Sequence, residues 1–464
     1  MASSFAADAA FVRAERLLDR AFSARANPLR HLGALGFLAF WILAASGIVL
    51  YIRFDTSAAG AYRSIEDLEW WFGGVLRSVH RYAADAFVVV VALHLVREWS
   101  AGRFRAFRAF SWISGLVALV LLYASGILGY WLVWDVRSQF SALSTAEWFD
   151  ALPFLGGTVA RNFLASEAVV DRLFSLFVFL HLGLPLALLA AMWVHVQRIG
   201  QPRTGVAGSL RIGFLVALLA LALALPATSL ARWEAHAIQG ALDLDWFLLF
   251  LHPLMQATSP QGLWWLAGGA TLFLVALPWL GGAARGVAAR VDPANCNGCG
   301  RCVADCPYQA VVLGATGKAE VFPERCAACG ICAGACPSST PFRSVRELVS
   351  GIDLPDETVH QLRRKLDALL ASGTSEVTFR CREAGSAPGA IDLRCVAMLP
   401  PSFIEYALRR GAKRVRACAC AERECAWRLG EEIAAARFAG ARAPHLRATV
   451  SFRKDRNEYS FALR

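Results

Sequence analysis

The stretch LRSVHRYAADAFVVVVALHLVREW, residues 76–99, decides the fold. It holds a fifteen-residue run, Tyr82–Val96, in which Asp85 is the only charged residue. An apolar run of this length between arginines is typical of a helix that spans a lipid bilayer. Because a carboxylate at that depth is costly, Asp85 is expected either to relay protons or to pair with an arginine.

Further uncharged runs follow the same pattern over the first 280 residues. Since roughly 20 apolar residues span a bilayer, the sequence predicts an all-α transmembrane bundle of six helices. The predicted spans are residues 33–52, 77–97, 112–133, 173–197, 212–230 and 262–281.

The composition agrees with this prediction, because the 464 residues are 56% hydrophobic and only 18% charged. Such a chain is neither disordered nor a purely cytosolic enzyme. The net charge of +11 comes largely from arginines between the apolar runs, which indicates membrane topology rather than nucleic-acid binding. The positive-inside rule then predicts a multi-pass protein with both termini in the cytoplasm. The arginines that carry this argument are Arg13, Arg16, Arg20, Arg25, Arg30, Arg97, Arg103, Arg105, Arg108, Arg198, Arg203 and Arg211.

Four histidines share one spacing within the predicted spans. His80 and His94 are fourteen residues apart, and so are His181 and His195. Fourteen residues is close to four helical turns, so both members of a pair face the same side, about 21 Å apart along the axis. Two facing helices would therefore stack His80 with His181 and His94 with His195, and each pair could hold one haem iron. Simple hydrogen bonding between helices, the alternative, leaves the shared spacing unexplained.

Glycines repeat this spacing in two other predicted spans. A position without a side chain would let a flat macrocycle lie against the backbone. These glycines are Gly33, Gly47, Gly115 and Gly129.

Residues 30–280 resemble cytochrome b, the quinol-oxidising subunit of bc-type complexes. The segments that carry the resemblance are residues 76–99, SGILGYWLVWDVRSQFSAL at 125–143 and FVFLHLGLPLALLAAMWVHV at 177–196. It implies two haems b, with Arg77 and Arg97 as partners of the haem propionates. It also implies a quinone site and a homodimer.

The segment LDLDWFLLF, residues 242–250, resembles the PEWYF segment of that family, whose acid takes part in proton release from quinol. Asp245 stands in the place of that acid and is the expected catalytic residue. The alternative is that Asp245 only caps a helix that starts at Trp246. The resemblance also implies that the loop Ser144–Phe163 covers the quinol site.

Two cysteine motifs follow the membrane part, CNGCGRCVADCP at 296–307 and CAACGICAGACP at 326–337. Both have the C-x2-C-x2-C-x3-C-P spacing of bacterial ferredoxins, in which the fourth cysteine binds the other cluster. The first 4Fe–4S cluster is expected on Cys296, Cys299, Cys302 and Cys336, and the second on Cys326, Cys329, Cys332 and Cys306. The intervening residues 307–325 fit a pair of short strands, and residues 343–372 are predicted to form a helical connector.

Residues 376–464 alternate short strand-like and helical runs, which predicts a small α/β domain with a parallel sheet. This part resembles the delta subunit of methyl-viologen-reducing hydrogenase. That resemblance implies a 2Fe–2S cluster and electron transfer to the flavin subunit of a heterodisulfide reductase. The cluster ligands carried over by motif are Cys381, Cys395, Cys420 and Cys425, with Cys418 left over.

The expected protein is therefore a multidomain membrane protein of the bacterial or archaeal cytoplasmic membrane. The expected parts are a cytoplasmic segment (1–30), the bundle (31–285), a ferredoxin-like α+β domain (290–342), a connector (343–375) and the α/β domain (376–464). Its expected function is that of a quinone-linked oxidoreductase subunit, which passes electrons to a cytoplasmic flavoprotein partner that performs the terminal catalysis. Two alternatives stay open: a redox-responsive membrane anchor without quinone turnover, and a bc-like subunit with a separate Rieske partner.

Overall fold

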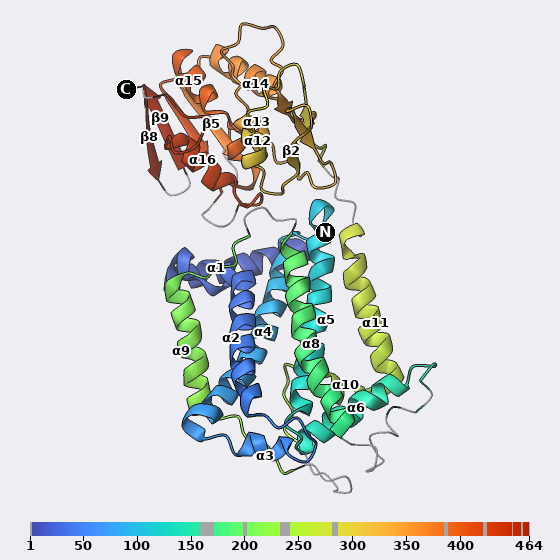
Figure 1. The fold of residues 1–464 in the computed structure, drawn as a ribbon. Helices are drawn as coiled ribbons and strands as arrows, with labels where there is room; N and C mark the ends of the chain where they lie inside the picture. The colour runs from blue at the N-terminus through green and yellow to red at the C-terminus, as the bar shows by residue number, and fades with distance from the viewer. Residues whose placement is uncertain are drawn as a thin grey trace. The chain divides into compact units, whose positions relative to one another are not determined.

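The computed structural model describes residues 2–155, 157, 159, 171–197, 202–232, 242–280, 286–384, 388–420, 425–447, 449–455 and 458–463. The chain forms two compact units. The helical unit comprises Met1–Val196 and Arg203–Gly282, and the α+β unit comprises Gln197–Pro202 and Ala283–Arg464. Figure 1 shows long helices in the first unit and short helices with strands in the second.

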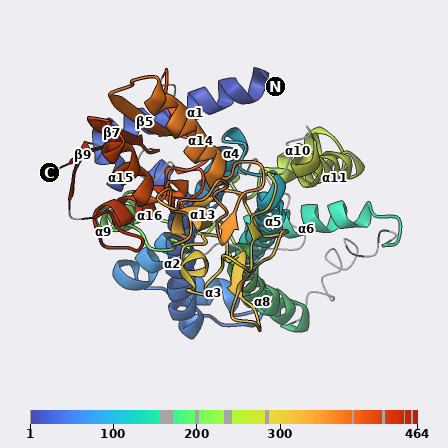
Figure 2. The same cartoon turned by 90° about the horizontal axis from the view of Figure 1, so that it is seen from above.

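Five helices of the helical unit are long and apolar enough to cross a membrane: Pro28–Arg53, Trp70–Ser100, Ala106–Trp131, Phe174–Val196 and Pro260–Trp279. They correspond to α2 (Leu32–Arg53), α4 (Val75–Ser100), α5 (Ala109–Trp131), α8 (Asp171–Val196) and α11 (Pro260–Ala276), which are labelled in Figures 1 and 2. The other helices of the unit are α1 (Ala2–Ala26), α3 (Ala61–Glu66), α6 (Val136–Asp150), α9 (Gly208–Ala224) and α10 (Leu251–Ala257). The chain is thus a multi-pass membrane protein.

The fifth predicted span, 212–230, is shorter than expected. Helix α9 has 17 residues and ends at Ala224, where Leu225 leaves the helical region with φ −132° and ψ 76°. The cause is Pro226, because proline disfavours the helical conformation in the residue before it. At about 1.5 Å per residue, α9 is somewhat shorter than the hydrocarbon core of a bilayer.

Two helix pairs build the bundle: α2 packs along α4, and α5 packs along α8. These four helices run alongside one another in Figure 1. Aromatic side chains fill one end of the bundle, where the ring of Trp131 meets Phe177 at 5.0 Å between centroids. Large apolar side chains point outward instead, such as Phe179 and Leu186, each 69% exposed. Lipid would cover such side chains in a membrane.

The α+β unit begins with the two cysteine motifs. Its first elements are β1 (Arg290–Val291), α12 (Arg301–Ala304), β2 (Val311–Leu313), β3 (Ala319–Val321), α13 (Ile331–Ala335), β4 (Ile352–Asp353) and α14 (Val359–Ala371). Strands β2 and β3 pair antiparallel, as predicted for the region between the motifs. The predicted connector, residues 343–372, is helical only in its second half, where α14 lies. Gly351 and Pro355 interrupt the first half, and β4 pairs there with β1.

The C-terminal part forms a five-stranded sheet in the order β6-β5-β7-β9-β8. Its elements are β5 (Glu376–Cys381), β6 (Ile391–Leu393), α15 (Pro401–Arg409), β7 (Arg414–Cys418), α16 (Gly430–Phe438), β8 (Val450–Asp455) and β9 (Glu458–Leu463). Strand β5 is parallel to β6 and β7, but β9 is antiparallel to β7 and β8. The prediction of a wholly parallel sheet is therefore wrong. The chain returns directly from β8 into β9 as a hairpin, and no crossover helix separates these two strands.

Candidate redox sites

The four histidines lie in two levels of the bundle. His80 on α4 faces His181 on α8, with 6.5 Å between their ring centroids. His94 and His195 lie four turns further along the same helices and interact electrostatically. The structure thus brings together the residues that the fourteen-residue spacing paired.

Hydrogen bonds to neighbouring helices orient three of these rings through their Nδ1 atoms. His80 Nδ1 lies 2.8 Å from Ser46 Oγ, and the Ser46 hydroxyl donates to the Ile42 carbonyl at 2.7 Å. The hydroxyl therefore accepts from Nδ1–H, so Nε2 carries the lone pair that can bind a metal.

The same arrangement recurs at the other level. His195 Nδ1 lies 3.1 Å from Ser114 Oγ, whose hydroxyl donates to the Phe110 carbonyl at 2.8 Å. His181 Nδ1 lies 3.0 Å from the Ser125 carbonyl, to which it can only donate. The sequence analysis missed these serines. Ser46 and Ser114 each directly precede one of the predicted glycines, a signal that could have identified them.

Each predicted glycine lies against one histidine ring. A Cβ atom on Gly47 would be 3.2 Å from His80 Cε1, and one on Gly129 would be 2.9 Å from His181 Cε1. At the other level the corresponding distances are 3.7 Å for Gly33 with His94 and 3.1 Å for Gly115 with His195. A side chain at Gly47, Gly115 or Gly129 would crowd the facing ring, whereas the contact at Gly33 is of ordinary length. The donor set and its surroundings fit two haems, each held by one histidine pair.

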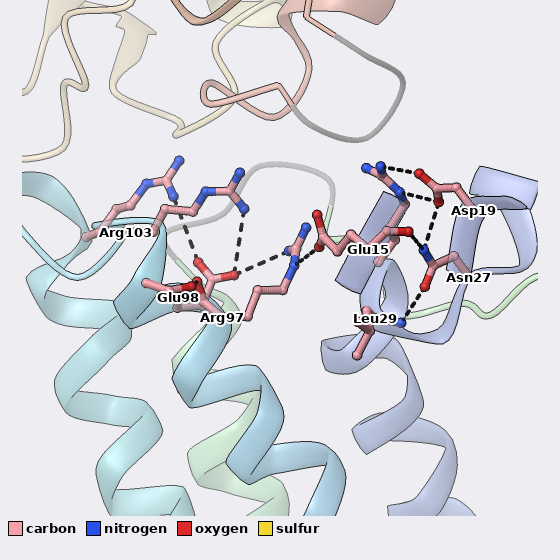
Figure 3. A network of polar contacts seen from close by, with 10 residues as sticks. Glu15, Asp19, Asn27, Leu29, Arg97, Glu98 and Arg103 are labelled. Carbon is pink, nitrogen blue, oxygen red and sulfur yellow. Dashed lines mark hydrogen bonds and ion pairs between the residues drawn. The ribbon is translucent and has the colours of Figure 1, made fainter. Parts of the chain in front are cut away.

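Both arginines expected at haem propionates are paired with other groups of the chain. Arg77 Nη2 donates to Ser229 Oγ at 2.8 Å, and its Nη1 lies 3.5 Å from Glu66. Arg97 Nε donates to Glu15 Oε1 at 2.7 Å. Figure 3 shows this second contact within a larger polar network.

That network attaches α1 to the end of α4. Glu15 is 5% exposed, and its backbone carbonyl accepts from Asn27 Nδ2 at 2.9 Å. Asn27 Nδ2 also donates to Asp19 at 2.7 Å, and Asp19 pairs with Arg30. The hydrogen bond from Arg30 lowers the pKa of Asp19 below its ordinary value. The sequence analysis missed Glu15, the acid on which Arg97 depends.

Asp245 is the centre of a second polar cluster. Its Oδ2 accepts from Tyr130 and lies 2.5 Å from Arg81 Nη2. Its Oδ1 accepts from the backbone N–H groups of Phe247 at 2.6 Å and Leu248 at 3.3 Å. Asp245 therefore caps the turn that precedes α10, but its other oxygen faces the bundle. A role as a helix cap therefore explains the contacts of only one of the two carboxylate oxygens.

Asp85 belongs to the same cluster. Its Oδ2 pairs with Arg81 one turn earlier on α4, so one guanidinium contacts two carboxylates. The Arg81 guanidinium also lies over the Tyr130 ring, 4.9 Å from its centroid. Of the two roles that the sequence left open for Asp85, the structure provides the pairing with an arginine.

In the α+β unit, the cysteine motifs bring their thiols together in two sets. Cys302 interacts electrostatically with Cys336, Cys299 and Cys296. The strongest such partners of Cys332 are Cys329, Cys326 and Cys306. These are the two crossed sets that the spacing indicated.

The backbone around these thiols suits inorganic clusters. Gly298, Gly300 and Gly330 have φ values of 70°, 72° and 78°, which only glycine adopts without strain. Backbone N–H groups point at the sulfurs, as from Ala310 to Cys306 Sγ at 3.2 Å. Burial raises the pKa of the Cys302 thiol to about 11, so a thiolate there needs a metal centre to neutralise it.

Within the described residues, no group of three or more His, Cys, Asp or Glu side chains converges tightly enough to hold a single metal ion.

A third set of cysteines lies where β5, β6 and β7 end. Cys381, Cys395, Cys420 and Cys425 are each at most 8% exposed, and the sulfurs of Cys381 and Cys420 are 3.4 Å apart. Gly430 leaves room for this set, since a Cβ atom there would overlap Cys395 Sγ. Four buried thiols are enough ligands for one two-iron cluster. Cys418, at the end of β7, is half-buried outside the set.

This set adjoins the second ferredoxin set. Cys329 interacts electrostatically with both Cys395 and Cys425. Cys329, Ile331 and Cys395 belong to one buried core, so the second motif and the C-terminal sheet pack together in one compact unit.

Histidine pairs in a membrane bundle, joined in one chain to ferredoxin cysteine sets, define a membrane-bound redox protein. Sequence profiles agree: cytochrome b/b6/petB matches residues 18–202, the 4Fe-4S dicluster domain 288–352, and the delta subunit of methyl-viologen-reducing hydrogenase 384–461. The chain belongs to the cytochrome b family. It is accordingly an electron-transfer subunit of an oxidoreductase, with haem b in the bundle and 4Fe–4S clusters in the dicluster domain.

Curated relatives match the first part of the chain. Cytochrome b6 of Heliobacterium mobile is 30% identical over 179 residues, 37% of this chain and 84% of the relative. Cytochrome b6 of Gracilaria tenuistipitata var. liui is 28% identical over 185 residues, 39% of this chain and 84% of the relative. A solved structure titled hyperthermophilic respiratory Complex III aligns with a TM-score of 0.45 and 20% identity. That alignment covers 55% of this chain and 76% of the other.

Proposed function

We propose that this chain exchanges electrons between membrane quinone and a soluble flavoprotein. The observation that carries the proposal is the cluster of Asp245, Arg81 and Tyr130 inside the bundle. Ionisable side chains within a membrane bundle are costly and mark pathways for substrates or protons. A quinol must lose two protons as well as two electrons when it is oxidised, so its site needs a proton acceptor.

Asp245 is the proposed acceptor. Its Oδ2 contacts Tyr130 and Arg81, and its Oδ1 is fixed by two backbone N–H groups. These contacts orient the carboxylate toward the bundle. A proton from the quinol hydroxyl would go to this carboxylate, and Arg81 would then keep its ion pair with Asp85.

The haem and cluster groups supply one-electron transfer when they are bound, and the chain provides the ligands. We assign one haem b to His80 and His181 and the other to His94 and His195. The hydrogen bonds at Nδ1 of His80, His181 and His195 leave the Nε2 atoms of these three rings available as ligands. Arg77 and Arg97 each lie about one turn from a ligand, which suits a partner of a propionate.

The cysteine sets continue the electron path. We assign two 4Fe–4S clusters to the crossed sets and a 2Fe–2S cluster to Cys381, Cys395, Cys420 and Cys425. The adjacency of Cys329 to Cys395 and Cys425 supports electron transfer between the second cubane and the two-iron cluster. The two-iron cluster would then be the exit to the partner.

The likeness of residues 384–461 to the hydrogenase delta subunit supports a partner related to the flavin subunit of heterodisulfide reductases. Terminal catalysis would belong to that partner. We further propose that the iron–sulfur domains and both termini lie on the cytoplasmic side, as the arginine distribution favours, and that the chain forms a homodimer.

The test is anaerobic addition of a short-chain quinol to the purified protein in mild detergent, with haem absorbance followed by stopped flow. Rapid reduction of both haems is expected. Haems that stay oxidised with quinol, but are reduced by dithionite, would favour a redox-responsive anchor without quinone turnover. Identification of the subunits that co-purify distinguishes a flavoprotein partner from a Rieske protein.

A further inference from the structure

The charge of one buried arginine lies between two of the proposed clusters. Arg437 is on α16, its side chain is fully buried, and it forms an ion pair with Asp305. Asp305 directly precedes Cys306, a ligand expected for the second cubane. A buried guanidinium is costly unless it is paired, and Asp305 supplies the opposite charge here.

The same guanidinium reaches both cysteine sets through backbone carbonyls. It donates to the carbonyl of Ile331 at 3.2 Å, next to Cys332, and to that of Ala397 at 2.7 Å, two residues after Cys395. Arg437 and Cys395 also interact electrostatically. One side chain therefore contacts segments that carry ligands of the second cubane and of the two-iron cluster.

The backbone around Arg437 leaves space for its guanidinium. A Cβ atom on Gly334 would be 2.7 Å from Arg437 Nη1. Gly334 lies between Cys332 and Cys336 in the second motif, where another residue would collide with the arginine. The motif and α16 are thus shaped to fit each other.

The local charges do not cancel. Asp305 also pairs with Arg442, whose nitrogen lies 2.5 Å from its other oxygen. Two guanidinium groups share one carboxylate, so one positive charge remains. The Arg442 side chain is 34% exposed, so water screens its charge, whereas the buried charge of Arg437 acts through a medium of low dielectric constant.

We propose that Arg437 is a positioning residue for electron transfer, a buried cation that raises the reduction potentials of the second cubane and the two-iron cluster and holds their ligand segments together. Reduction adds one electron to a cluster, and a nearby fixed positive charge stabilises that more negative state. The first cubane should shift less, because the carbonyls to which Arg437 donates lie within two residues of Cys332 and Cys395, ligands of the other two clusters. This inference rests on the cluster assignments of the proposed function.

The experiment compares Arg437→Gln with the matched control Arg442→Gln in the full-length protein. Iron content is measured first, and cluster potentials are then measured by redox titration followed by electron paramagnetic resonance. Arg437→Gln should lower the potentials of the second cubane and the two-iron cluster, and should lower that of the first cubane less. Arg442→Gln should shift them much less.

Two further variants keep the test decisive if Arg437→Gln loses iron. Arg437→Lys retains the charge and should keep potentials close to wild type. Asp305→Asn removes a negative charge beside Cys306 and should raise the potential of the second cubane. Unchanged potentials in iron-replete Arg437→Gln, or in Asp305→Asn, would overturn the proposal.

A separate result would contradict the proposed function instead. A wild-type protein whose iron content and spectra show only two cubanes would lack the two-iron cluster. The potential of the second cubane would still report on Arg437 in that case, so the two failures are distinguishable.

Discussion

Arg81 Nη2 lies 2.5 Å from Asp245 Oδ2, an ion pair that joins α4 to the segment before α10. The same guanidinium pairs with Asp85, so the positive charge is shared between two carboxylates of the bundle. This arrangement would orient Asp245 as the proton acceptor of the proposed quinol site. It also explains how α4 can carry a carboxylate among apolar residues.

Asp245→Asn should slow the reduction of the haems by added quinol, because an amide cannot accept the proton. The expected decrease is about 100-fold or more, the usual contribution of a general base. Haem spectra and reduction by dithionite should be unchanged. The matched control is Asp243→Asn, which changes an exposed carboxylate two residues earlier. In this variant quinol should reduce the haems at the wild-type rate. Equal rates for both variants would remove Asp245 from the mechanism.

His94→Ala and His195→Ala should each abolish the same haem, since both would be ligands of one iron. The haem of His80 and His181 should remain in both variants. Redox-resolved absorption spectra distinguish the two haems. Loss of different haems in the two variants would contradict the pairing of α4 with α8.

Gly129→Ala should displace the His181 ring and decrease occupancy by the haem of His80 and His181, because the added Cβ would be 2.9 Å from His181 Cε1. The control is Gly183→Ala on α8 itself, where an added Cβ meets no atom of the described structure within 4 Å. Haem-to-protein ratios of the purified variants provide the measurement. A full haem complement in Gly129→Ala would show that the helices can separate at that level.

Cys420→Ser should remove the two-iron cluster and leave both haems and both cubanes in place. Quinol should still reduce the haems, while reduction of the soluble partner should fail. Cys418→Ser is the control, because Cys418 lies outside the buried set, and it should retain all the iron. If Cys420→Ser keeps its iron and still reduces the partner, the C-terminal domain is a docking module.

Several features of the sites could be predicted because local geometry determines them. A helix repeats every 3.6 residues, so the spacing of His80 and His94 already places both on one face. A cysteine motif closes within a few residues, so its spacing defines the loop around a cluster. Family resemblance added Asp245, for which no periodic pattern exists.

Other features depend on contacts between segments far apart in the sequence. Strand β9 returns antiparallel beside β7, and no local pattern distinguishes that from a parallel crossover. The serines that orient the histidines, and Glu15 beside Arg97, each lie on a different helix from their partner. Their roles appear only when the helices pack.

The sequence by itself therefore determined which residues share a helix face or a cluster loop, since those relations are set by short-range backbone geometry. Only the tertiary structure decided which oppositely charged residues from distant segments form ion pairs. Arg81 on α4 meets Asp245, and Arg437 meets Asp305, because the packing of distant elements leaves each of these buried charges within reach of an opposite one. A buried charge without such a partner would destabilise the fold, so these pairs are a condition of folding.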